Sequence, residues 1–221
     1  MVIEEACRQA ASWRDLFGGR ERLSISVNLS AKQFSNGVDL LNQIGRGLTT
    51  FGLEAEFLRV EITESAIMRN PELATVTLLE LRRLGIGVHL DDFGTGYSSL
   101  GYLQRFPVDT LKIDRSFVSS PASPAVRNPE IVQTVASLAR SLALETTAEG
   151  IESLEQLQYL RALGRTYGQG HYFSRPVDAF DAGVLIADWN AADRASVCCP
   201  WERVARETRR RRSARILRAT S

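Results

Sequence analysis

The chain has few cysteines, and it contains no long hydrophobic segment. Its three cysteines, Cys7, Cys198 and Cys199, are too few and too clustered for a disulfide framework or a zinc site. No apolar run approaches the roughly 20 residues that a membrane-spanning helix needs. The first ten residues, MVIEEACRQA, lack the basic-then-apolar order of a secretory signal. We therefore expect a cytoplasmic protein without a membrane span.

Lysine is also scarce in this sequence. Of the 27 lysine and arginine residues, only Lys32 and Lys112 are lysines. Lys112 lies in an apolar run that is typical of a strand. At such a position a compact ammonium group can sit beside a phosphate or an activated water, where a broad guanidinium group would not fit. Lys112 is therefore a candidate functional residue. The alternative is a side chain that snorkels to the surface.

The formal net charge of +1 hides an uneven distribution of charge. Residues 201–221 carry eight arginines and two glutamates, a net charge of +6, which leaves −5 on residues 1–200. A short, charge-dense tail without a cluster of aromatic residues buries little surface. We expect residues 191–221 to be flexible or a short helix, and contact with nucleic acid to be unlikely. Residues 1–190 form the expected domain.

Short β-branched or apolar runs alternate along the chain with longer helical stretches. A chain of 221 residues with 44% hydrophobic residues can bury one large core, so we expect one domain. Strands that alternate with helices indicate parallel βαβ connections, and hence a doubly wound sheet or a (β/α)8 barrel. The predicted strand runs are 23–30, 57–65, 85–92, 109–116, 142–150 and 167–176. A helix is predicted over 70–85, starting near Pro71, and another over 129–144.

Each predicted strand run contains or ends in a polar residue. In a barrel the carboxyl ends of all strands converge on one face, whereas in an open sheet they spread along a line. Several separate strand-end polar groups therefore favour the barrel. The alternative, in which each residue caps the following helix or turn, suits Asn28 and Asp91. The strand-end residues are Asn28, Glu61, Asp91, Asp92, Lys112, Glu149 and Gln169.

Five of these residues offer only oxygen ligands. Oxygen-only sets suit hard cations such as Mg²⁺ or Mn²⁺ rather than zinc. Four carboxylates are too many for one small divalent ion, but they fit a pair of ions about 4 Å apart, with Asp91 able to bridge them. The predicted metal ligands are Asn28, Glu61, Asp91, Asp92 and Glu149.

Six motifs of the sequence resemble, in order and spacing, those of the EAL domain family of bacterial cyclic di-GMP phosphodiesterases. The motifs are SVNLSAKQF, VEITES, LDDFGTGYSSLGYL, LKIDRSFV, AEGIESLEQL and GQGHYFSRP, within roughly residues 3–185. The resemblance implies an α/β protein with a TIM-type barrel. It also implies hydrolysis of the signalling molecule cyclic di-GMP to linear pGpG with two Mg²⁺ or Mn²⁺ ions.

The resemblance also implies roles for individual residues. Asn28, Glu61 and Asp91 match ligands of one metal ion, and Asp91, Asp92 and Glu149 match those of the second. Lys112 and Glu149 are the implied catalytic residues, and Lys112 matches the lysine that orients or activates the attacking water. Gln169 and Glu152 are the implied substrate-binding residues. The segment that links metal binding to a possible homodimer contact includes Glu64, Phe93, Gly94, Thr95 and Gly96.

The sequence also departs from the family pattern. It contains no Glu-Ala-Leu motif, so we expect a barrel that is incomplete at its N-terminus, with about six of the eight strands. The motif's glutamate ligand and a nearby phosphate-holding arginine are missing with it, and we expect the chain to be inactive or very weak. An alternative function is a non-catalytic module that binds cyclic di-GMP or a protein. His89 and His171 are expected to be packing or surface residues.

Overall fold

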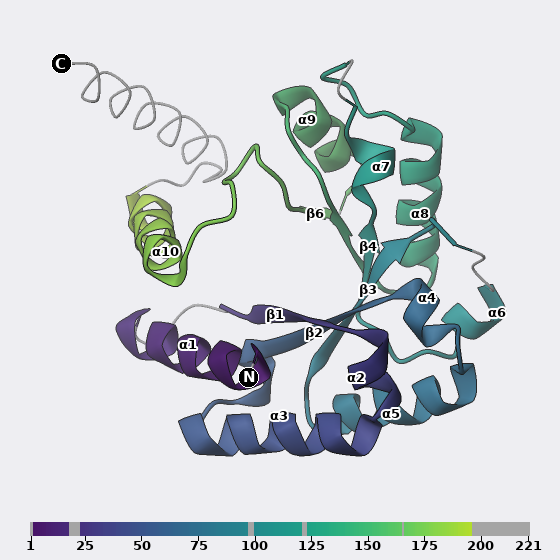
Figure 1. The fold of residues 1–221 in the computed structure, drawn as a ribbon. Coiled ribbons are helices and arrows are strands. Elements are labelled where there is room, and N and C mark those ends of the chain that lie inside the picture. The colour runs from purple at the N-terminus through teal and green to yellow at the C-terminus, as the bar shows by residue number, and fades with distance from the viewer. Residues whose placement is uncertain (1, 18–22, 97–99, 121–122, 165, 196–221) are drawn as a thin grey trace.

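The computed structural model describes residues 2–17, 23–96, 100–120, 123–164 and 166–195. Within these ranges, six strands form one parallel sheet whose order follows the sequence, and the sheet curls into a half-barrel (Figure 1). The strands are β1 (Ile25–Leu29), β2 (Leu58–Thr63), β3 (Gly87–Phe93), β4 (Thr110–Ile113), β5 (Glu145–Ala148) and β6 (Thr166–Gly168). All six predicted strands are confirmed. The last one is shorter than predicted, because turns follow it.

Helices lie between successive strands, and several begin at a side-chain cap. Asn70 accepts a hydrogen bond from the N–H of Leu73 at the start of one helix, and Ser30 and Ser153 open two others with capping boxes. The helices are α1 (Val2–Phe17), α2 (Ala31–Ser35), α3 (Gly37–Phe51), α4 (Glu64–Ile67), α5 (Pro71–Arg83), α6 (Leu100–Leu103), α7 (Arg115–Val118), α8 (Pro129–Ser141), α9 (Leu154–Ala162) and α10 (Ala179–Ala195), with a 3-10 turn at η1 (Ala55–Phe57).

The two faces of the sheet differ in polarity. Successive side chains of a strand alternate between the two faces of the sheet. The side chains on the outer face form one apolar set, and this set packs against α5 and α8. Its members are each at most 2% exposed: Val60, Ile62, Val88, Leu90, Leu111 and Ile113. The inner face instead carries Asn28, Glu61 and His89, which follow one another in the register of β1, β2 and β3. The core therefore lies outside the sheet, and polar groups lie inside its curl.

The last helix of the described chain packs against the first. A Cβ added at Gly183 of α10 would lie 3.3 Å from Nε1 of Trp13 in α1, and Figure 1 shows the two helices side by side. The predicted domain boundary after residue 190 falls within α10, and residues 196–221 of the arginine-rich tail lie outside the described residues. No described helix is long and apolar enough to cross a membrane.

The turns that follow β5 and β6 are held together by backbone hydrogen bonds. The N–H of Ile151 donates to the carbonyl of Gln169 at 3.1 Å, and the N–H of Tyr172 donates to the carbonyl of Ile151 at 2.9 Å. This pairing leaves no room at Gly170, where an added Cβ would overlap the backbone N and O of Ile151. The relative position of the two turns is therefore fixed by main-chain contacts.

Gly170→Ala is expected to destabilise the protein by about 1–3 kcal/mol or more, because the new methyl group meets backbone rather than a flexible side chain. Gly45→Ala is the matched control, since a Cβ in that helix meets nothing within 4 Å, and it should stabilise by up to about 1 kcal/mol. Urea unfolding of both variants measures the two changes. A Gly170→Ala variant as stable as wild type would contradict the close approach.

Candidate active site

Lys112 lies among three carboxylates on the inner face of the sheet. Its Nζ is 2.5 Å from Oε2 of Glu61, 2.5 Å from Oε1 of Glu149 and 3.1 Å from Oδ1 of Asp91. The lysine is only 2% exposed. Four adjacent strands supply these groups at or just beyond their carboxyl ends, so the structure brings together the four residues as the barrel interpretation requires.

The charges around Lys112 set different protonation preferences. Burial on its own would lower the pKa of Lys112, but hydrogen bonds and charge attraction from Glu149 and Glu61 outweigh burial and raise this pKa, so the ammonium stays protonated. Burial would raise the pKa of Glu61, yet the interactions with His89 and Lys112 prevail and lower it to about 2. Burial, reinforced by the charges of Asp91 and Glu61, raises the pKa of Glu149 despite Lys112. Glu149 is therefore a better proton acceptor than Glu61.

Asp91 and Asp92 are adjacent in the chain, but they have different neighbours. The register between β3 and β4 shifts at these two residues, which marks a bulge. Asp92 has a φ of 54°, uncommon for a residue other than glycine, and its N–H donates to Oδ1 of Asp91 at 3.0 Å. Burial, followed by repulsion from Asp91 and Asp114, raises the pKa of Asp92. The bulge thus places one aspartate beside Lys112 and the other beside Asp114.

Among the described residues, two sets of carboxylates are close enough to hold a cation. In each set, one oxygen from each residue lies within 4.8 Å of the others; the sets are Glu61, Asp91 and Glu149, and Asp92, Asp114 and Glu149. All of these donors are oxygens, and hard divalent cations prefer such donors. Asn28 is the register partner of Glu61 in the neighbouring strand. Glu149 belongs to both sets, whereas the sequence predicts Asp91 as the shared ligand, and that assignment stays a prediction.

Asp114 is a site residue that sequence reasoning missed. It follows β4 directly and caps α7, accepting a hydrogen bond from the N–H of Ser116 at 3.0 Å. Its position just past a strand end was a usable signal, the same one that identified Glu149. An aspartate before a short helix, however, is explained equally well by capping alone.

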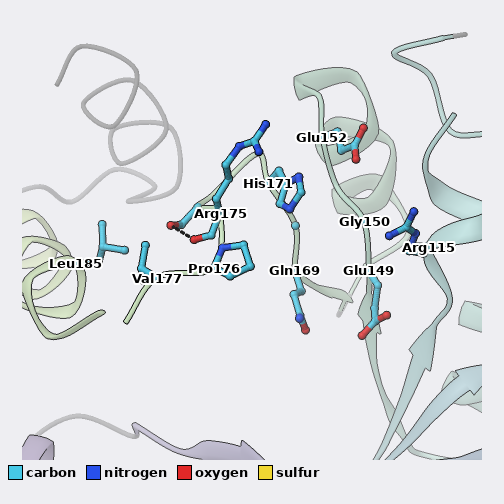
Figure 2. A pocket seen from close by; sticks show the side chains of 12 residues that line it. Arg115, Glu149, Gly150, Glu152, Gln169, His171, Arg175, Pro176, Val177 and Leu185 are labelled. Atoms are coloured by element: carbon cyan, nitrogen blue, oxygen red, sulfur yellow. Dashed lines mark hydrogen bonds between the residues drawn. The ribbon is translucent and has the colours of Figure 1, made fainter. Parts of the chain in front are cut away.

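A pocket of about 500 Å³ opens beside Glu149. Figure 2 shows that the side chains of Glu149 and Gln169 extend from the ends of neighbouring strands in the same direction. The predicted substrate-binding residues, Gln169 and Glu152, both line the pocket. Sequence reasoning missed two arginines there and predicted no binding role for the histidine. The pocket also includes Arg115, His171, Arg175, Pro176, Val177 and Leu185.

The loop after Asp92 is tied to Glu64. The Glu64 side chain is buried, and its Oε2 accepts a hydrogen bond from the N–H of Gly94 at 3.2 Å. Oγ1 of Thr95 donates to the carbonyl of Asp92 at 2.9 Å, and a Cβ at Gly96 would lie 3.8 Å from the Glu64 carboxylate. The described part of the predicted coupling segment is therefore in contact with the site, and residues 97–99 lie outside the described residues.

The fold and the site define an α/β-barrel protein with a buried lysine and carboxylates at the carboxyl ends of its strands. The model of the EAL domain family matches residues 1–176. The cyclic di-GMP phosphodiesterase NbdA of Pseudomonas aeruginosa is 44% identical over 178 residues, which cover 80% of this chain and 22% of NbdA. The chain belongs to the EAL domain family. It spans less than a quarter of the length of NbdA.

Solved structures agree with this assignment. The PaMucR phosphodiesterase in complex with c-di-GMP has a TM-score of 0.74 and 39% identity, and the match covers 82% of this chain and 77% of that one. The EAL domain of Mycobacterium smegmatis DcpA has a TM-score of 0.75 and 34% identity, covering 85% of this chain and 82% of that one.

Lys112→Met should destabilise the protein by about 3–5 kcal/mol in a chelator, because one buried and two half-buried carboxylates lose the ammonium that they share. The same variant should gain more thermal stability from Mn²⁺ than wild type does, because a divalent cation then has no ammonium to displace. Calorimetry with and without Mn²⁺ tests both effects. An equal Mn²⁺ gain in the two proteins would argue against shared ligands.

Acid stability should depend on Glu61. Its folded pKa of about 2 lies below its ordinary value of 4.5, so its ionised form contributes stability above pH 4.5 that is lost as the pH falls toward about 2. Glu149 has the opposite effect on stability: its pKa is raised in the folded protein, so its ionisation destabilises the fold as the pH rises. Between about pH 5 and pH 2.5, Glu61→Gln should lose less unfolding free energy than wild type. The exposed Glu56→Gln variant should follow wild type; a parallel decline in all three proteins would exclude this role.

Proposed function

We propose that this site hydrolyses a phosphodiester bond of cyclic di-GMP to give linear pGpG, with two divalent cations. The observation that carries the proposal is the convergence of Lys112 with Glu61, Asp91 and Glu149 at the strand ends of an EAL domain. The relatives supply the substrate: NbdA is named for this activity, and PaMucR was solved with c-di-GMP.

The carboxylate sets fit Mg²⁺ or Mn²⁺. Glu61, Asp91 and Glu149, with Asn28 beside them, would hold one ion, and Asp92, Asp114 and Glu149 would hold the other. When bound, such ions lower the pKa of a water and neutralise charge on the phosphate. The ions are proposed to be Mg²⁺ or Mn²⁺ on the chemistry of the donors alone.

Lys112 is proposed to orient the attacking water as a hydrogen-bond donor. Its raised pKa keeps Nζ protonated in this arrangement, so it is a poor general base. The lysine therefore supplies a fixed donor and a positive charge near the reacting phosphate, while a carboxylate receives the proton.

The pocket beside Glu149 is proposed to hold one part of the nucleotide. Arg115 and Arg175 can pair with phosphate or with the edge of a guanine, and Gln169 offers both a donor and an acceptor. Pro176 and Val177 supply an apolar surface for a base. The main-chain bonds between the turns after β5 and β6 hold these groups in one arrangement.

A second copy of the chain is proposed to contact the loop that follows Asp92. Support comes from Glu64, which joins this loop to the end of β2 through the N–H of Gly94. Thr95 of this loop donates a hydrogen bond to the carbonyl of Asp92, so a partner that moved the loop would also act on Asp92. Dimerisation through this loop stays a proposal.

The alternative function is a non-catalytic module that binds cyclic di-GMP. It rests on one observation, the absence of a Glu-Ala-Leu sequence from the chain. Among the described residues, we assign no counterpart to the glutamate and the arginine that accompany this motif. Because a small displacement of the reacting groups strongly lowers the rate of hydrolysis, we expect turnover by this chain to be slow or undetectable.

The test is incubation of the 221-residue chain with cyclic di-GMP and Mg²⁺ or Mn²⁺, followed by chromatography of the products and calorimetry of binding. We expect metal-dependent binding, with slow or undetectable pGpG formation, and turnover that rises when a segment carrying the Glu-Ala-Leu motif is joined ahead of residue 1. In that longer protein, Lys112→Ala should abolish turnover and largely preserve binding, because Lys112 acts on the water.

Lys32→Ala is the matched control, since Lys32 is the other lysine of the chain and is exposed. Binding without turnover in the extended protein would favour the non-catalytic module. Absence of both binding and turnover would refute both functions. Rapid pGpG formation by the 221-residue chain would show that the missing motif is dispensable.

A further inference from the structure

A polar pair lies beneath the site, on the inner face of β2 and β3. His89 is the register partner of Glu61, and Arg59 is the register partner of Gly87, so all three side chains share the inner face. His89 is buried. The mechanism proposed above uses neither His89 nor Arg59, although His89 lies level with Glu61 and Arg59 lies one layer below.

Arg59 fixes the chemical state of His89. Nη1 of Arg59 lies 3.2 Å from Nε2 of His89. A guanidinium can only donate hydrogen bonds, so Nε2 must be the acceptor, and a neutral imidazole then carries its proton on Nδ1. Gly87 makes this contact possible, because a Cβ there would lie 3.3 Å from Cγ of Arg59 and crowd the side chain.

The proton on Nδ1 faces the site. Nδ1 of His89 lies 3.8 Å from Oε1 of Glu61, while Lys112 holds the other oxygen, Oε2, at 2.5 Å. At 3.8 Å the N–H and the carboxylate attract each other without a direct hydrogen bond. The two oxygens of Glu61 are therefore distinguished: Oε1 faces a neutral donor on the neighbouring strand, and Oε2 faces the cation of Lys112.

We propose that His89 is a positioning residue for Glu61: Arg59 holds it as the neutral Nδ1–H tautomer, and this N–H orients Oε1 so that Oε2 faces Lys112 or a bound cation. The effect on a cation rests on the proposed function, whereas the tautomer does not. Donors that orient a metal-binding side chain commonly change metal affinity 10–100-fold when they are removed.

The tautomer can be observed directly by NMR. The chain has two histidines, His89 and His171, so a multiple-bond ¹H–¹⁵N spectrum of the ¹⁵N-labelled protein contains two imidazole patterns, and His171→Gln assigns them. We expect His89 to show a protonated Nδ1 and an unprotonated Nε2. Arg59→Met should yield a mixture of tautomers. An Nε2–H tautomer or an imidazolium at His89 in the wild-type protein, or an unchanged pattern in Arg59→Met, would overturn the proposal.

Mn²⁺ affinity tests the consequence for the site. His89→Leu should weaken Mn²⁺ binding about 10-fold or more, whereas His89→Asn, whose amide N–H can take the place of Nδ1–H, should retain most of the affinity. A purely structural role predicts no such rescue. Equal affinity in wild type and His89→Leu would contradict the proposal, as would an equal loss in both variants.

Stability is measured alongside, by thermal unfolding of each variant. If His89→Leu fails to fold, His89→Asn and Arg59→Met carry the test, with affinity retained in the first and reduced in the second. If the wild-type protein binds no Mn²⁺ at all, the proposed metal chemistry fails, and the NMR spectrum still decides the tautomer. The failure of one idea is thereby distinguishable from the failure of the other.

Discussion

The ammonium of Lys112 holds the inner face of this sheet together. Three carboxylates from neighbouring strands meet it within 3.1 Å, at a depth where unpaired charges are costly. The outer face can be wholly apolar because helices cover it, whereas the inner face carries polar and charged side chains. The same lysine that stabilises the acidic residues also marks where a divalent cation would bind, so stability and cation binding compete for one set of oxygens.

The bulge at Asp91 and Asp92 gives two adjacent carboxylates different neighbours, although they still repel each other. It keeps Asp91 beside Lys112 and turns Asp92 to Asp114, so that the two charges belong to different sets. Glu149 joins both sets. The backbone bonds that fix the turns after β5 and β6 then relate Glu149 to the pocket.

Much of this arrangement could be predicted from the sequence, for physical reasons. Apolar runs separated by helical stretches imply parallel strands, and parallel strands in a barrel bring their carboxyl ends together, so the meeting of Glu61, Lys112 and Glu149 follows from their places in the runs. The role of each residue stays a prediction, including which carboxylate is shared between cations.

Other parts of the site could not be predicted in this way. His89 lies in the middle of a strand run, and its contact with Glu61 depends on the register between β2 and β3, which a single sequence does not specify. Asp114 has a sufficient local explanation as a helix cap. Arg115 reaches the pocket from the start of α7, and Arg175 reaches it from the chain that follows β6. Arginine is too common in this chain to single them out.

The central claim is that Lys112 and a divalent cation use the same carboxylates. A crystal structure of the protein grown with Mn²⁺, with anomalous difference maps, tests it most directly. The account predicts a manganese peak among Glu61, Asp91 and Glu149, with Nζ of Lys112 moved away from at least one of them. Manganese bound elsewhere, or bound there with all three lysine contacts intact, would contradict the claim.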